Sequence, residues 1–182
     1  MSSLLLIMNY EQLKAFTRPD RVGLALPWSE GDYSYASNGK ILIRVPRLPD
    51  VPEQETAPRK IEGEVLWEPV GCQWLPMPMA EEPKKEKCSQ CNGGLHLCTC
   101  GNKHTCPSCS GSGMRSRDVV LAFCGKSVFQ KDIALLCRLP GIEIPNMAIA
   151  NDRCSVPFRF WASEGKRGIG VVTTKAEAIN GG

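Results

Sequence analysis

The stretch that decides the fold of this chain is Cys88–Gly113, with the sequence CSQCNGGLHLCTCGNKHTCPSCSGSG. It contains two Cys-x-x-Cys pairs, Cys88/Cys91 and Cys106/Cys109, with fourteen residues between them. A turn of this kind presents two thiolates to one metal ion, and tetrahedral zinc needs four soft ligands. Glycines after each pair permit tight turns and bring N–H groups toward the sulfurs. The sequence therefore predicts one structural zinc ion bound by these four cysteines.

A second zinc site is predicted within the loop between the two pairs. The loop contains the only two histidines of the chain, His96 and His104, together with Cys98 and Cys100. Residues two apart on an extended strand lie about 6 to 7 Å apart, so these ligands need a bend near residues 101–102 to reach one ion. Two alternatives remain open: solvated side chains at a hairpin tip, or a ligand set that exchanges with the first site.

The second cysteine pair continues as Cys106-Pro107-Ser108-Cys109-Ser110-Gly111-Ser112-Gly113 and matches the repeat Cys-x-x-Cys-x-Gly-x-Gly. This module resembles the cysteine-rich domain of DnaJ-type chaperones. It has two repeats instead of four, and in this it is similar to the small anti-TRAP zinc proteins. The first pair departs from the repeat at Gly93-Gly94, and the chain has no His-Pro-Asp motif of a J domain. The resemblance implies a zinc-folded hairpin with a binding role instead of classical co-chaperone activity.

The segments on the two sides of this module repeat one order of elements. Each has a strand, a helix that opens with a capping-box pattern, and three more strands, with Asn38-Gly39 and Glu164-Gly165 as hairpin turns. In the first segment we expect strands at residues 3–8, 22–26, 33–36 and 41–45, with a helix opened by Asn9 and Gln12. In the second we expect strands at residues 119–123, 142–144, 156–161 and 169–173, with a helix opened by Ser127 and Gln130. The predicted class is α+β with two βαβββ units.

Two βαβββ units in tandem resemble one domain of a DNA sliding clamp. The stretch Tyr35–Leu42 is similar to the clamp turn in which an Asp-Gly dipeptide joins two strands. The resemblance implies a clamp-like platform of residues 1–45 and 118–176, with the zinc hairpin module, residues 84–117, inserted into it. Residues 46–83 are predicted as a proline-rich linker with a lone strand at Glu64–Trp67. The alternative is an unrelated α+β sandwich.

Cysteine usage and apolar patterning indicate a cytoplasmic protein. Six of the ten cysteines fall within residues 88–109, which favours metal binding in a reducing compartment over a disulfide scaffold. Cys124, Cys137 and Cys154 are expected in the core. The apolar run Leu4–Met8 is too short for a signal peptide or a membrane span, so no membrane association is expected.

Basic residues concentrate beside the cysteines. Residues 84–117 contain six basic residues and one acidic residue, a charge of +5, so the rest of this +3 chain carries −2. We expect Lys84, Lys85, Lys87, Arg115 and Arg117 to contact a partner, the alternative being a solvated charged face. No aromatic residue lies between Lys84 and Arg117, so this module is not expected to stack on bases.

The predicted function is that of a non-enzymatic adaptor or inhibitor that binds a protein through its zinc hairpin. Nucleic acid is the second partner class. A thiol–disulfide oxidoreductase using Cys106 and Cys109 is one alternative, although the glycines that follow disfavour the helix such enzymes need there. A chaperone-like holdase is another, with Trp67, Trp74, Met77 and Met79 as contacts unless they pack on the platform.

Overall fold

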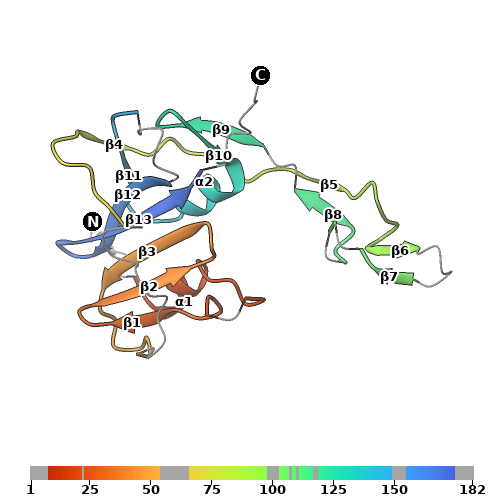
Figure 1. Cartoon of the computed structure of the whole chain (residues 1–182), viewed down its shortest axis with the longest axis horizontal. Coiled ribbons are helices and arrows are strands. Elements are labelled where there is room, and N and C mark those ends of the chain that lie inside the picture. The colour runs from red at the N-terminus through yellow and green to blue at the C-terminus, as the bar shows by residue number, and fades with distance from the viewer. Residues whose placement is uncertain are drawn as a thin grey trace, which may run out of the picture.

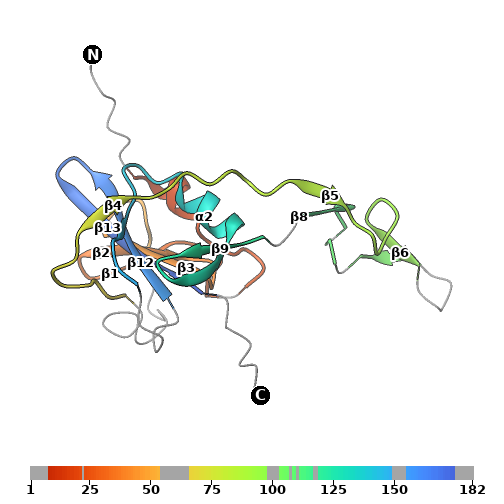
Figure 2. The same cartoon turned by 90° about the horizontal axis from the view of Figure 1, so that it is seen from above.

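The structure is a computed structural model that describes residues 8–21, 23–53, 66–97, 103–106, 108–109, 111–116, 119–148 and 155–174. It has a mostly β fold with two short helices, and a large antiparallel sheet forms a platform (Figure 1). A narrow module that includes residues 85–116 extends away from one end of the platform, as two perpendicular views show (Figures 1 and 2).

Seven strands form the platform sheet, and each strand is antiparallel to its neighbours. Their order across the sheet is β1-β2-β3-β13-β12-β11-β4. Strands from the two ends of the chain therefore meet at the β3/β13 pair, where Ile43 lies opposite Gly170. The strands are β1 (Trp28–Glu30), β2 (Tyr33–Ser37), β3 (Ile41–Pro46), β4 (Trp74–Pro76), β11 (Glu143–Pro145), β12 (Ser155–Ser163) and β13 (Lys166–Thr173).

Each half of the chain supplies a helix followed by three strands. Helix α1 (Tyr10–Lys14) precedes β1 to β3, and α2 (Gln130–Leu136) precedes β11 to β13, so the two sets flank the β3/β13 pair in mirrored order. Before α2 lies a hairpin of β9 (Val120–Phe123) and β10 (Lys126–Phe129), which confirms the strand predicted at residues 119–123. The strand predicted at residues 3–8 falls outside the described residues except for Met8, whose N–H donates to the Ala162 carbonyl at 2.8 Å.

The two predicted helix caps have different outcomes. Asn9 caps α1, and Gln12 completes the capping box with reciprocal hydrogen bonds of 3.0 Å, as expected. The predicted cap at Ser127 is wrong, because Ser127 pairs with Ala122 inside the β9–β10 hairpin. The N-cap of α2 is Phe129, without a side-chain cap. The Gln130 N–H at the start of α2 instead donates to the Val119 carbonyl at 2.8 Å. A backbone carbonyl is therefore the acceptor that a capping side chain would otherwise provide.

The strand predicted at residues 22–26 is also wrong. Residues 23–26 form turns, and the first strand of this half, β1, begins only at Trp28. The backbone of this segment forms local hydrogen bonds instead of strand pairs. The Leu24 carbonyl accepts from the Arg18 N–H at 2.7 Å, and the Leu24 N–H donates to the Arg21 carbonyl at 3.0 Å. The predicted hairpin at Asn38-Gly39 is confirmed, with the Asn38 Oδ1 accepting from Lys40 and Ile41 at 2.9 and 2.8 Å.

The segment predicted as a linker packs on the platform at several points. Residues Trp74–Pro76 form edge strand β4, and Val51 and Met77 are buried in the main core. Glu64 and Val65 of the predicted lone strand lie outside the described residues, whereas Leu66 is buried in a second cluster with Trp67 packed against it. Proline spacing predicted an extended chain but could not predict that the chain lies along the sheet.

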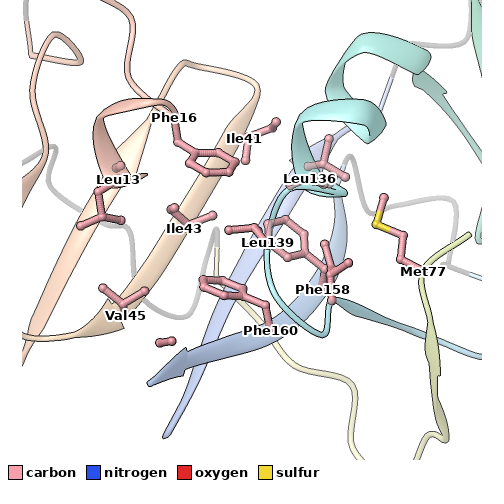
Figure 3. Packing of buried hydrophobic residues seen from close by; sticks show 14 of the residues in the cluster. Leu13, Phe16, Ile41, Ile43, Val45, Met77, Leu136, Leu139, Phe158 and Phe160 are labelled. Carbon is pink, nitrogen blue, oxygen red and sulfur yellow. The ribbon is translucent and has the colours of Figure 1, made fainter. Parts of the chain in front are cut away.

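The main core lies between the helices and one face of the sheet. Figure 3 shows its members converging: Leu13 and Phe16 from α1, Ile41, Ile43 and Val45 from β3, Leu136 and Leu139 from α2 and the residues after it, and Phe158 and Phe160 from β12. Each fully buried side chain of this size contributes about 1.5 to 3 kcal/mol of burial free energy. The Phe160 ring takes the space over Gly168 on the neighbouring strand.

The module consists of two small ribbons. Strand β5 (Lys85–Lys87) pairs with β8 (Met114–Ser116) next to the platform, and β6 (Leu95–Leu97) pairs with β7 (Lys103–Thr105) farther out (Figure 1). Within the described residues, no helix has the length and apolar character that a membrane crossing requires.

Candidate metal centre

Four cysteine sulfurs meet between the two ribbons of the module. The Sγ atoms of Cys88, Cys91, Cys106 and Cys109 all lie within 4.8 Å of one another. The Cys88–Cys106 and Cys91–Cys109 separations are 3.9 and 3.5 Å. Zinc–sulfur bonds of about 2.3 Å in a tetrahedron place neighbouring sulfurs about 3.8 Å apart, whereas a disulfide needs about 2.05 Å. All four are free thiols, and their spacing matches the edges of a tetrahedral metal site.

The backbone brings the two pairs together by a reciprocal arrangement. Cys88 follows β5 directly, and its N–H donates to the Gly113 carbonyl at 2.9 Å. Cys106 follows β7 directly, and its N–H donates to the Gly94 carbonyl at 2.8 Å. The first cysteine of each pair is therefore anchored to the glycine turn that follows the other pair. Folding one knuckle thus depends on the presence of the second.

Glycine is required where these turns touch. Gly94 has a φ of +96°, and a Cβ there would lie 2.0 Å from the carbonyl oxygen of Gly111. Gly113 has a φ of +71°, and a Cβ there would lie 3.1 Å from the carbonyl carbon of Gly93. The departure of the first pair from the Cys-x-x-Cys-x-Gly-x-Gly spacing is therefore accommodated, because Gly94 occupies a position equivalent to that of Gly113 in the reciprocal contact.

The cluster distributes its protons unevenly when no metal is bound. Burial raises the pKa of both Cys91 and Cys109, but the hydrogen bond between them lowers the pKa of Cys109 and raises that of Cys91. The Gly113 N–H also donates to Cys109 Sγ at 3.3 Å and lowers its pKa further. As a result the pKa of Cys109 is about 7 and that of Cys91 about 12. Of these two cysteines, Cys109 is the one that offers a thiolate to a metal near neutral pH.

The donor set fits a structural zinc ion. Cys88, Cys106 and Cys109 are at most 8% exposed, and among the described residues the half-buried Cys91 is the one that packs against them. Four protein sulfurs complete a tetrahedron, so an ion bound here has no open position for a substrate water. The ion would replace the missing apolar core of the module and supply its folding free energy.

The second predicted zinc site lies only partly within the described residues. Cys98 and Cys100 fall outside them, and so does the predicted bend at residues 101–102. His96 and His104 are register partners across β6 and β7. The structure thus brings the two histidine positions together, and the second zinc site stays a prediction.

The predicted partner-binding residues lie mostly on the ribbon next to the platform. Lys84, Lys85, Lys87 and Arg115 are exposed, with Glu86 opposite Arg115, and Arg117 lies outside the described residues. Sequence reasoning missed two exposed apolar side chains of the module, one on each ribbon. Met114, opposite Lys87, is 39% exposed, and Leu95 is 49% exposed. The sequence pattern that could have indicated them is an apolar residue directly after each glycine turn.

The other cysteines that the structure describes are not part of this site. Cys124 and Cys137 pack against the main core, and their Sγ atoms donate to the carbonyls of Pro145 and Pro78 at 3.5 and 3.6 Å. Burial raises the pKa of Cys124 to about 11, as expected for a packed thiol. Cys154 lies outside the described residues, and half-buried Cys72 donates to the Pro69 carbonyl at 3.7 Å.

The residues predicted for the oxidoreductase and holdase functions lie in different parts of the structure. The described part of the Cys106–Cys109 segment forms a turn after β7 and not the start of a helix. Of the holdase contacts, Met77 and Trp67 pack in or against the core, Trp74 is half-buried in β4, and Met79 is 83% exposed. These residues therefore do not form one exposed apolar patch.

Comparison with protein-family models, with curated proteins and with solved structures finds no match for this chain.

Proposed function

We propose that this protein is a zinc-stabilised adaptor or inhibitor that presents its metal-folded module to a protein partner. The observation that carries the proposal is the four-sulfur cluster between the two ribbons of the module. The module itself extends from a well-packed platform (Figure 1). Because the site is closed, its metal contributes order and not catalysis. A rigid module held away from a platform suits recognition of another macromolecule.

The surface of the module supports a protein partner with an acidic surface. On the β5–β8 ribbon the exposed side chain of Met114 lies opposite exposed Lys87, on the strand face that Lys85 shares, and exposed Arg115 is on the other face. An apolar contact with basic neighbours fits a protein surface that has an apolar patch with acidic residues around it. The same charges also suit phosphates, but no aromatic residue of the module is available to stack on bases.

Three finer assignments belong to this proposal. The Cys-x-x-Cys-x-Gly-x-Gly pattern and the reciprocal glycine contacts support a DnaJ-like, anti-TRAP-like zinc module. The mirrored order of β1–β3 and β13–β11, each set preceded by a helix, supports a clamp-like platform. A cytoplasmic location follows from the need to keep the four thiols reduced.

The test is affinity capture with four forms of the intact protein, followed by binding of the purified partner. The metallated wild type should retain a partner that is lost when Cys88, Cys91, Cys106 and Cys109 are changed to serine. The ribbon variant Lys85→Ala/Lys87→Ala/Arg115→Ala should bind more weakly and keep its zinc. The matched control removes three exposed basic residues of the platform, Lys14, Arg18 and Arg21, and should bind as wild type. Equal retention by the serine variant would refute the proposal.

A further inference from the structure

The outer face of the platform sheet, opposite the main core, has two different halves. Near one end it is covered, because Leu66 is buried there against Trp28, Tyr35, Leu42 and Val171. The other half displays arginine and aromatic side chains that remain partly open to solvent. Tyr33 and Trp161 are 36% and 38% exposed. We call this half the arginine–aromatic face and define it as Tyr33, Arg44, Trp74, Glu143, Arg159, Trp161 and Arg167.

Three arginines of this face lie over three aromatic rings. The guanidinium of Arg167 lies 3.5 Å from the ring centre of Trp161. That of Arg159 lies 4.6 Å from the ring centre of Trp74. On the other side of the sheet centre, Arg44 lies 4.2 Å from the ring centre of Tyr33. Each stack holds a planar cation flat on the sheet instead of leaving it to move in solvent.

One carboxylate fixes two of these stacks. The Oε2 atom of Glu143 lies 2.6 Å from Arg159 and 3.2 Å from Arg167. The side chains of the three residues are 24% to 30% exposed, so the group is fixed but accessible. Two arginines share one carboxylate oxygen, which leaves this group with a net charge of +1.

Strand pairing arranges the face as a row across the sheet. Arg44 pairs with Ile169, Ile169 with Arg159, and Arg159 with Glu143, so the row crosses β3, β13, β12 and β11. Neighbouring strands are about 4.8 Å apart, which gives the row a length of about 15 Å. Phe158 and Phe160 of β12 and Ile43 of β3 pack on the opposite side of these strands and hold the row in place.

The positive charge of this face is local. Three arginines and one glutamate give the face a charge of +2. Basic residues interleaved with aromatic rings on an open sheet are the arrangement with which several folds bind single strands.

We propose that the arginine–aromatic face binds single-stranded nucleic acid. Phosphates would contact the three guanidinium groups, and bases would stack on the guanidinium–ring layers and on Tyr33. A duplex hides its base faces and could use only the charges. An acidic peptide could use the charges but would gain little from three aromatic rings. The proposal does not depend on the metal centre, because the face and the four cysteines share no residue.

The test measures fluorescence anisotropy of a labelled mixed-sequence single strand with the intact metallated protein. Three phosphate contacts predict a log–log salt slope of about −2 for a single strand, so affinity should fall about 20-fold from 50 to 200 mM salt. The variant Arg44→Gln/Arg159→Gln/Arg167→Gln should remove this salt dependence. Tyr33→Leu/Trp161→Leu should lower affinity at least fivefold with the salt slope unchanged, because it removes stacking and keeps the charges.

Two controls separate this face from the module and from a merely structural role. Lys85→Ala/Lys87→Ala/Arg115→Ala and zinc removal should leave single-strand affinity unchanged. Glu143→Gln should raise affinity, because it releases both arginines from their shared anion. Circular dichroism and thermal unfolding confirm that each variant is folded. Equal affinity for a duplex or for poly-glutamate, a salt slope near zero, or weaker binding by Glu143→Gln would overturn the proposal.

Discussion

The backbone N–H of Cys106 donates a 2.8 Å hydrogen bond to the carbonyl oxygen of Gly94, which belongs to the other cysteine knuckle. The matching bond from Cys88 to Gly113 measures 2.9 Å. These two bonds connect the knuckles even before the sulfurs share a metal. The glycine turns are therefore part of the metal site, although they supply no ligand.

Gly94→Ala should lower zinc affinity. The new Cβ would lie 2.0 Å from the Gly111 carbonyl oxygen, and backbone atoms cannot move aside as a flexible side chain can. Overpacking of this kind costs about 1 to 3 kcal/mol, which corresponds to about 5- to 150-fold in affinity. Competition with a chromophoric chelator measures the change.

Gly93→Ala is the matched control for this variant. Gly93 also has a positive φ, +60°, but a Cβ there meets nothing within 4 Å. Its alanine variant therefore carries backbone strain without the collision. Equal zinc affinities for the two variants would mean that the Gly94–Gly111 contact has no part in metal binding.

Removing the metal should unfold the module and spare the platform. The cluster at the centre of the module contains only cysteines, whereas the platform has its own core of about twenty buried residues. We expect chelation to abolish amide protection in β5 to β8 and to leave β3, β12 and β13 protected. Hydrogen exchange read by mass spectrometry distinguishes the two regions, and loss of protection in β12 would contradict independent folding.

Two zinc equivalents should bind, and the weaker one should depend on His96 and His104. These residues are register partners across β6 and β7, so the strand pairing brings the two positions together. His96→Ala/His104→Ala should remove the weaker equivalent and keep the one bound by the four cysteines. Elemental analysis of reduced protein gives the count, and a single equivalent in the wild type would end the prediction of a second site.

Zinc affinity should depend more steeply on pH below about 7 than just above it. A pKa of about 7 means that Cys109 is already a thiolate in the metal-free cluster at pH 8. As the pH falls through this value Cys109 takes up a proton, which zinc must then displace, and affinity loses a further factor of about ten per pH unit. Chelator competition between pH 6 and 8.5 should show this break. If the logarithm of zinc affinity changed linearly with pH through pH 7, the assignment of Cys109 as a thiolate would be contradicted.

The sequence predicted the elements that depend on local chemistry. The capping box at Asn9, the turn at Asn38-Gly39 and the paired cysteines each need only a few neighbouring residues. The errors arose where backbone hydrogen bonds to nearby segments replaced the structure that the residue pattern indicated. Ser127 has the spacing of a cap, but the β9–β10 ladder uses its backbone, and Val119 supplies the acceptor for α2.

The linker and the outer sheet face could not be predicted for a related reason. Nothing near Trp74 or Met77 indicates an edge strand or a core position, since both depend on β11 and Ile142, more than sixty residues later. The arginine–aromatic face combines residues from β2, β3, β4, β11, β12 and β13. Only the strand register brings these residues together, and the sequence does not reveal that register.

The β12–β13 pair offers a test of how the platform core is packed. Phe160 lies opposite Gly168, and a Cβ on Gly168 would lie 2.4, 2.7 and 2.9 Å from three atoms of the Phe160 ring. Gly168→Ala should therefore destabilise the platform by about 1 to 3 kcal/mol through overpacking. At about 2 to 4 °C per kcal/mol for a chain of this size, Tm should fall by about 2 to 12 °C. Phe160→Leu alone should also destabilise, because it leaves a void over the glycine. The double variant Gly168→Ala/Phe160→Leu should be more stable than the sum of the two changes, since the added methyl group occupies the space that the ring vacates. Additive losses in thermal unfolding would show that the ring and the glycine are not coupled.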